Sequence, residues 1–87
     1  MSDLPPAYER IGDRVAKKNP GVARDSVEFR RLLVPALMFY MGCFYRTKMT
    51  PAELQEHADR IVAGDILDIE VDTANGKLKL IAKEKER

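Results

Sequence analysis

The sequence contains one cysteine, Cys43, and one histidine, His57, among its 87 residues. A single cysteine excludes a disulfide within the chain, so the fold depends on its apolar core and suits a reducing compartment. One cysteine and one histidine are also too few for a set of zinc ligands. We therefore expect a cytoplasmic protein with no cofactor and no bound metal.

The sequence also lacks the features of exported and membrane-spanning proteins. Its amino terminus carries an acid and two prolines where a secretory signal would place basic residues before an apolar run. The longest uncharged run, residues 32–45 (LLVPALMFYMGCFY), would extend roughly 21 Å as a helix, whereas a bilayer core is about 30 Å thick. We predict no transmembrane segment. Attachment to a membrane surface stays open, because basic residues flank this run: Arg30, Arg31, Arg46 and Lys48.

Charge of one sign is not in excess, because 15 basic residues balance 14 acidic ones. Such a balance gives no strong field for nucleic acid or for an acidic membrane. The charges are nevertheless uneven: residues 1–48 carry nine basic and five acidic side chains, and residues 49–87 carry six and nine. This asymmetry favours head-to-tail contacts or a partner with its own dipole, unless the two halves neutralise each other within one fold.

Three segments have the pattern of helices, and the first runs from about Pro6 to Lys18. Proline is tolerated in the first turn, and Asn-Pro-Gly at residues 19–21 ends the helix. Gly12 within it costs about 1 kcal/mol relative to alanine, so this residue either permits a close contact with another helix or leaves its own helix weak. The apolar stripe consists of Tyr8, Ile11 and Val15.

The second helix is capped by Asp25 and Ser26, with Glu28 placed to complete a capping box, and it extends to about Arg46. It contains the uncharged run. Pro35 interrupts it, because an interior proline loses a hydrogen bond and clashes with the preceding turn, at a cost of about 3 kcal/mol. We expect a kink at this point, or two shorter helices that meet at Val34.

The third helix begins at a threonine cap, Thr50, with Pro51 in the first helical position and Glu53 three residues after the cap. Gly64 ends it. Its apolar face consists of Leu54, Ala58, Ile61 and Val62.

The hydrophobic period then changes to two, which is typical of strands. Apolar and charged residues alternate on either side of Asn75 and Gly76, and Asn-Gly in this setting is a strong hairpin signal. A two-residue turn there would place Val71 opposite Leu80, so that apolar groups share one face and charges the other. The opposed charges would be Asp72 with Lys79 and Asp68 with Lys83.

Together these elements predict one small α+β domain over residues 1–87. It has two to three helices, with a long apolar central helix kinked or broken near Pro35, and then a C-terminal antiparallel β-hairpin. We expect residues 1–4 and 84–87 to be frayed.

No constellation of side chains points to an enzyme or to a metal site. Cys43 and His57 would meet if the second and third helices packed together, but apolar neighbours would keep the thiol unreactive and no orienting acid is in reach. The oxygen ligands near the hairpin alternate along strands instead of converging on an ion. They are Asp65, Asp68, Glu70, Asp72 and Asn75.

The central helix carries more bulky apolar side chains than the single stripes of its neighbours can cover, and a lone hairpin leaves both edges unpaired. We therefore expect a non-enzymatic cytosolic protein that forms a homodimer through this helix or a hairpin edge. It would bind another macromolecule, as an adaptor or regulatory module. In the alternative, the helix is simply the core of a monomer. The predicted interface consists of Leu33, Leu37, Phe39, Tyr40, Met41 and Phe44.

Two further functions stay open. Three helices and a hairpin resemble a winged helix in outline, with residues 50–63 as the recognition helix and Lys77 and Lys79 on the wing. The acidic residues of that helix oppose contact with phosphate. The other function is binding of a small apolar ligand against flexible and aromatic side chains: Met38, Phe39, Met41, Phe44 and Met49.

Overall fold

The computed structural model describes residues 4–83 of the chain. Its helices precede its strands: a 3-10 turn η1 (Pro6–Tyr8), α1 (Glu9–Lys18), α2 (Val27–Phe39), a π-helical segment η2 (Tyr40–Phe44), α3 (Pro51–Val62), β1 (Ile66–Asp72) and β2 (Lys77–Ala82). This order confirms the predicted α+β class, with a C-terminal antiparallel hairpin. The expected fraying of residues 1–4 and 84–87 falls on residues outside the described range, except for Leu4, which is half-buried against the core.

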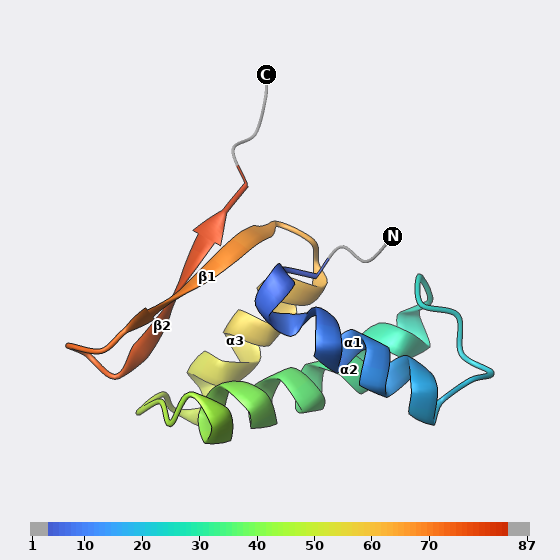
Figure 1. Ribbon diagram of the computed structural model, residues 1–87, viewed down its shortest axis with the longest axis horizontal. Coiled ribbons are helices and arrows are strands. Elements are labelled where there is room, and N and C mark those ends of the chain that lie inside the picture. Colours follow the sequence, from blue (N-terminus) through green and yellow to red (C-terminus); the bar gives the residue numbers. More distant parts are fainter. Residues whose placement is uncertain (1–3, 84–87) are drawn as a thin grey trace.

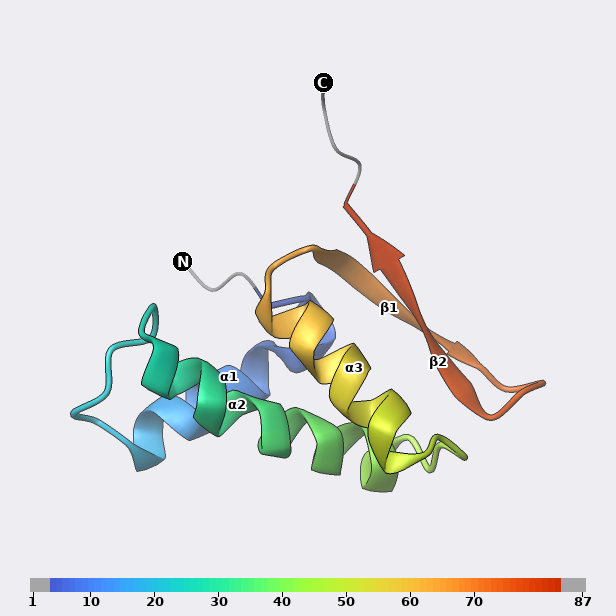
Figure 2. The same cartoon turned by 180° about the vertical axis from the view of Figure 1, so that it is seen from behind.

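The helices and the hairpin occupy different sides of the molecule. Helices α1 and α2 lie side by side in opposite directions, and α3 packs across α2 (Figure 1). The hairpin lies beyond α3 and projects away from the helices, as the view from behind also shows (Figure 2). One long face of the α1–α2 pair is therefore not covered by the hairpin.

The core is organised around one stripe of the central helix. Phe29, Leu33, Leu37 and Met41 recur at every fourth position, and each is at most 4% exposed. Residues four apart lie on the same face of a helix, so this stripe forms a continuous ridge. Its buried neighbours come from the other elements: Tyr8, Ile11, Val15, Met49, Ala58, Ile61, Ile66 and Leu78.

The same helix leaves other apolar side chains in water. Phe39 is 72% exposed and Phe44 is 66% exposed, and Leu32 is exposed as well. The elements around the central helix thus cover one stripe of it and leave large apolar groups uncovered.

Pro35 does not split the helix at Val34. Helix α2 continues through Pro35, and the irregularity appears one turn later as the π-helical segment η2. Pro35 is exposed, as is Arg31, whose carbonyl would receive the missing hydrogen bond, so water can take the place of the lost donor.

The caps of α2 and α3 follow the sequence with one correction. Thr50 and Glu53 form the predicted capping box, in which the Glu53 N–H donates to Thr50 Oγ1 at 3.2 Å. At α2 the cap is Ser26, which accepts from the Phe29 N–H at 3.2 Å. Glu28 is then only two residues past the cap, so the predicted capping box there was wrong.

Gly12 permits a close contact, but with residues outside the helices, Leu4 and Arg24, and not with a neighbouring helix as one of the two interpretations of the sequence had it. A Cβ at this position would lie 2.6 Å from Leu4 Cδ1 and 2.9 Å from Arg24 Nη2. The glycine therefore lets Leu4 and Arg24 pack directly on the backbone of α1.

The hairpin exists as predicted, but its register is shifted by two residues. Val71 faces Leu78, and Glu70 faces Lys79. The connection comprises the four residues 73–76, because Asp72 closes the turn by accepting from the Asn75 N–H at 3.2 Å and its Nδ2 at 2.8 Å. A shift of two residues keeps every side chain on its face, so the hydrophobic pattern alone does not distinguish the two registers.

Besides the buried side chains of Ile66 and Leu78, three polar contacts among residues 4–83 attach the hairpin to the helical part. The Lys48 N–H donates to the Gly76 carbonyl at 2.7 Å, and Lys77 Nζ lies 3.0 Å from Glu53 Oε2. This lysine is the main cause that lowers the pKa of Glu53, followed by the Thr50 N–H. The third is a hydrogen bond between His57 Nε2 and the Leu78 carbonyl at 3.1 Å, which requires the proton to reside on Nε2.

Replacing Leu37 by alanine is expected to lower the free energy of unfolding by about 2–5 kcal/mol, because its fully buried side chain leaves a cavity in the ridge. Phe39→Ala, in the same helix, should change it by less than about 0.5 kcal/mol. Urea denaturation followed by circular dichroism measures both. Equal losses for the two variants would contradict the assignment of one buried and one exposed face.

Gly76→Ala is expected to cost about 1–2 kcal/mol, because Gly76 has φ 65° and an added Cβ would lie 3.1 Å from the Lys48 side chain. Gly21→Ala is the matched control, since a Cβ there meets nothing within 4 Å. Thermal unfolding of the two variants should separate them. A Gly76→Ala protein as stable as the control would be incompatible with this turn.

Candidate functional site

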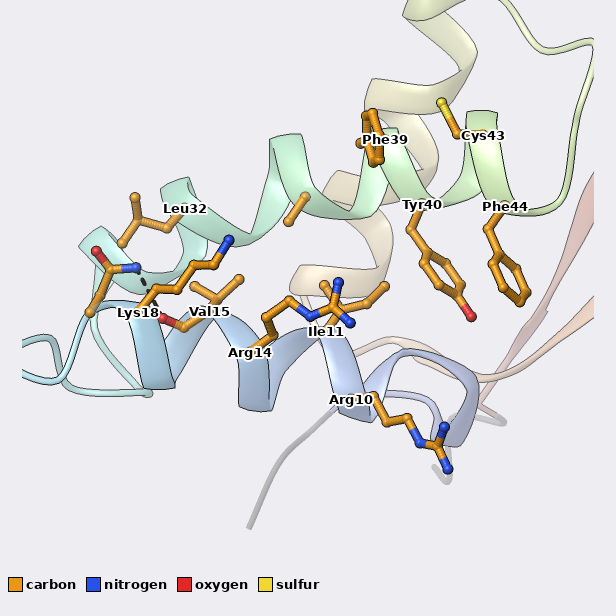
Figure 3. A pocket seen from close by; sticks show the side chains of 12 residues that line it. Arg10, Ile11, Arg14, Val15, Lys18, Leu32, Phe39, Tyr40, Cys43 and Phe44 are labelled. Atoms are coloured by element: carbon orange, nitrogen blue, oxygen red, sulfur yellow. Dashed lines mark hydrogen bonds between the residues drawn. The ribbon is translucent and has the colours of Figure 1, made fainter.

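A groove of about 800 Å³ runs between α1 and the central helix. We call it the α1–α2 groove. Figure 3 shows side chains entering it from both helices, with Arg14 and Lys18 on the α1 side and the rings of Tyr40 and Phe44 on the other. Its lining consists of Arg10, Ile11, Arg14, Val15, Lys18 and Asn19 from α1 and its C-cap, and Leu32, Ala36, Phe39, Tyr40, Cys43 and Phe44 from α2 and η2.

The α1 side of the groove carries a row of positive charges. Arg10, Arg14 and Lys18 are four residues apart, so they share one edge of the helix, and all three are exposed. None of them forms an ion pair with a carboxylate of residues 4–83. In contrast, Arg24 outside the groove is paired with Asp13 at 3.0 Å. We call the three groove cations the basic row.

The opposite side of the groove is apolar and partly aromatic. The rings of Tyr40 and Phe44 stack at 4.6 Å with an interplanar angle of 9°. Tyr45 meets both rings edge-on, at 5.4 Å and 5.3 Å, and Tyr8 meets Tyr40 edge-on at 5.6 Å. These contacts hold the exposed ring of Phe44 in place, so its apolar surface is presented in a defined orientation.

Two tyrosines that contact Tyr40 have raised pKa values. Burial, followed by the electrostatic effect of the neighbouring phenols of Tyr45 and Tyr40, raises the pKa of Tyr8, whose buried hydroxyl has no hydrogen-bond partner within residues 4–83. Burial is also the main cause that raises the pKa of Tyr45. Both of these phenols therefore stay protonated in the neutral range.

The six residues of the predicted interface separate into two groups. Leu33, Leu37 and Met41 are buried inside the single chain, where they belong to its core ridge. Phe39, Tyr40 and Phe44 line the groove. Whether a second copy binds them stays a prediction.

Sequence reasoning missed the α1 side of the site. In the sequence, Arg10, Arg14 and Lys18 belong to the charged residues that point away from the apolar stripe of the first helix, and no site is predicted there. The four-residue spacing of the basic row was visible in the sequence, but that spacing does not show that the row borders a groove. The apolar part of this side consists of Ile11 and Val15, which the sequence assigned to the core stripe.

Cys43 and His57 do not form a dyad. Nδ1 of His57 is buried and has no hydrogen-bond partner among residues 4–83, and Nε2 bonds to the Leu78 carbonyl, so neither ring nitrogen is bonded to the thiol. The expectation that apolar neighbours would enclose Cys43 was wrong, because the residue is exposed at the groove. The π-helical segment turns its side chain outward while Met41 faces the core.

Metal and membrane features were sought in the described part of the chain. Among residues 4–83, no group of three or more histidines, cysteines and acids is placed to hold a metal ion. Asp72, one of the candidate ligands, instead accepts hydrogen bonds from Asn75, and these lower its pKa. Within the same range, the helices lack the combination of length and hydrophobicity needed to cross a membrane.

Comparison with protein-family models, with curated proteins and with solved structures finds no match to this chain. The chemistry of the α1–α2 groove is therefore the basis for assigning a function.

Cys43 is expected to react with Ellman's reagent in the native protein at a rate close to that of the urea-unfolded chain, because its side chain is exposed. The assay is unambiguous because the sequence has one cysteine. A native thiol that reacts only after unfolding would contradict the position of Cys43 at the groove surface.

Proposed function

We propose that this protein is a non-enzymatic interaction module whose α1–α2 groove binds an amphipathic helix of another protein. The observation that carries the proposal is the pair of exposed phenylalanines, Phe39 and Phe44, on the wall of a groove between two antiparallel helices. Large exposed apolar side chains gathered at one place are typical of interaction sites. Recognition of a helix in a groove uses this kind of surface.

The dimensions of the groove suit a short helix. Its apolar wall extends from Leu32 to Phe44, which corresponds to roughly 18 Å along the central helix, or about three helical turns. A third helix lying along two antiparallel helices can insert its own ridge between them. The neutral floor formed by Ile11, Val15 and Ala36 would receive apolar side chains of such a helix.

Charge argues against a second copy of this chain as the occupant. Two grooves placed face to face would bring two basic rows into one interface, where like charges repel. If an edge strand of the hairpin paired with the same strand of a second copy, like charges would also be brought together. Asp68 and Glu70 alternate along β1, and Lys77 and Lys79 alternate along β2, so antiparallel pairing of either strand with its copy opposes like charges. A homodimer remains the competing outcome of the experiment below.

Charge also argues against the winged-helix alternative. The exposed side of α3 carries two acidic residues, Glu56 and Asp59, which would repel phosphate. Lys77 of the hairpin is paired with Glu53 of α3. The α1–α2 groove brings exposed apolar side chains together with three cations that no carboxylate of residues 4–83 pairs with.

Phe44→Ser and Phe39→Ser are each expected to weaken binding of an amphipathic helical peptide by about tenfold or more, because each removes aromatic surface that the peptide would bury. The probe is a fluorescein-labelled synthetic peptide of about 18 residues with one leucine stripe, and fluorescence anisotropy measures its affinity. Leu67→Ser is the control, because Leu67 is a similarly exposed apolar residue of the hairpin, outside the groove.

Light scattering on the same samples tests the competing occupant. The proposal expects a monomer in the absence of peptide. A dimer that Phe44→Ser converts into a monomer would assign the groove to a second copy instead. An absence of peptide binding, or an equal loss in Leu67→Ser, would also overturn the proposal.

A further inference from the structure

We infer that the partner helix is acidic along one flank, with carboxylates at four-residue intervals that match the basic row of α1. This inference rests on the proposed function and adds the chemistry that would select the partner. It is carried by three cations on one edge of the groove that no carboxylate of residues 4–83 neutralises.

The acidic residues of α1 do not lie at the basic edge of the groove. Glu9 and Asp13 are absent from the lining of the groove, and Asp13 is engaged with Arg24 at 3.0 Å. No acidic residue lines the groove from α2 or η2 either. The groove therefore has a net positive charge that no carboxylate in the described part of the chain compensates.

The spacing of the basic row defines the spacing of the acidic residues that could pair with it on a partner helix. Arg10, Arg14 and Lys18 follow one another at roughly 6 Å along α1, at about 1.5 Å per residue. Glutamates or aspartates four residues apart on a helix lying along the groove repeat at the same interval. Each carboxylate can then meet one cation without bending either helix, and arginine can do so with two parallel hydrogen bonds.

The charges lie on one side of the groove only. The opposite wall presents Leu32, Phe39 and Phe44, and the cations are confined to α1 (Figure 3). A matching helix therefore needs an apolar stripe bordered by acids on one flank. An anionic membrane has no such pairing of an apolar ridge with a single charged edge, and nucleic acid has no apolar stripe, so the geometry favours an acidic amphipathic helix.

Three synthetic peptides of one length and one leucine stripe test the inference, with glutamate, glutamine or lysine at the flanking positions. We expect the glutamate peptide to bind the full chain roughly tenfold more tightly than the glutamine peptide, and the lysine peptide to bind most weakly. The preference should shrink in high salt, because exposed charge pairs are screened. Anisotropy at two salt concentrations measures both effects.

Charge reversal on the protein provides the stronger test. Arg14→Glu should lower the affinity for the glutamate peptide and raise it for the lysine peptide, while Lys17→Glu should leave the order of the peptides unchanged, because Lys17 lies on α1 but outside the groove. Circular dichroism verifies that each variant is folded. Lys18→Glu provides an independent variant of the basic row if Arg14→Glu does not fold.

The outcomes separate this inference from the proposed function. Equal binding of the glutamate and glutamine peptides would overturn the inference and leave the groove as a helix-binding site. Failure of all three peptides would overturn the proposed function as well. Binding to phosphatidylglycerol vesicles but to none of the peptides, lost in Arg14→Glu, would assign the basic row to a membrane surface and overturn the inference.

Discussion

The structure depends on one ridge of the central helix, in which Phe29, Leu33, Leu37 and Met41 are buried at every fourth position. A single ridge can be enclosed by two helices, and α1 and α3 do this from either side. No further element of residues 4–83 covers the outer face, since the hairpin lies beyond α3 (Figure 2). The exposure of Phe39 and Phe44 follows from this arrangement, because the helix has more apolar faces than packing partners.

The groove follows from the same packing. Helix α1 turns Ile11 and Val15 toward the ridge, so the residues immediately before them in the sequence, Arg10 and Arg14, border the contact. The apolar stripe of α1 is narrow, and basic residues therefore begin where it ends. An apolar wall from one helix and a charged edge from the other thus become neighbours without a dedicated loop. The stacked ring of Tyr40 keeps Phe44 in position and gives the apolar wall a defined shape.

Features that depend on a few adjacent residues were predicted well from the sequence. Features that depend on contacts between distant parts of the chain were predicted less well. The capping box at Thr50, the stop after Lys18 and the hairpin around Asn75 each depend on a few adjacent residues, and the structure has all three. The hairpin register was missed because a shift of two residues preserves both faces, and the choice between registers depends on the hydrogen bonds of Asp72 to Asn75. At the central helix, the sequence left open whether Pro35 kinks or splits it, and the structure has the unsplit alternative, with a π-helical irregularity after α2.

The candidate site was predictable only in part, because the sequence does not show which face of an apolar helix will be buried. An uncharged run has no polar stripe, so its composition does not show which side will be buried. The interface predicted from apolarity therefore combined Leu37 and Met41, which are buried in the core, with Phe39 and Phe44, which are exposed. The packing of α1 and α3 on the central helix decides which of these side chains are buried. The position of α1 also places its solvent-exposed row of cations at the edge of a groove. The exposed apolar side chains leave most of their surface uncovered, and the basic row beside them pairs with no carboxylate of residues 4–83. A helix with an apolar stripe and an acidic flank would supply both kinds of contact.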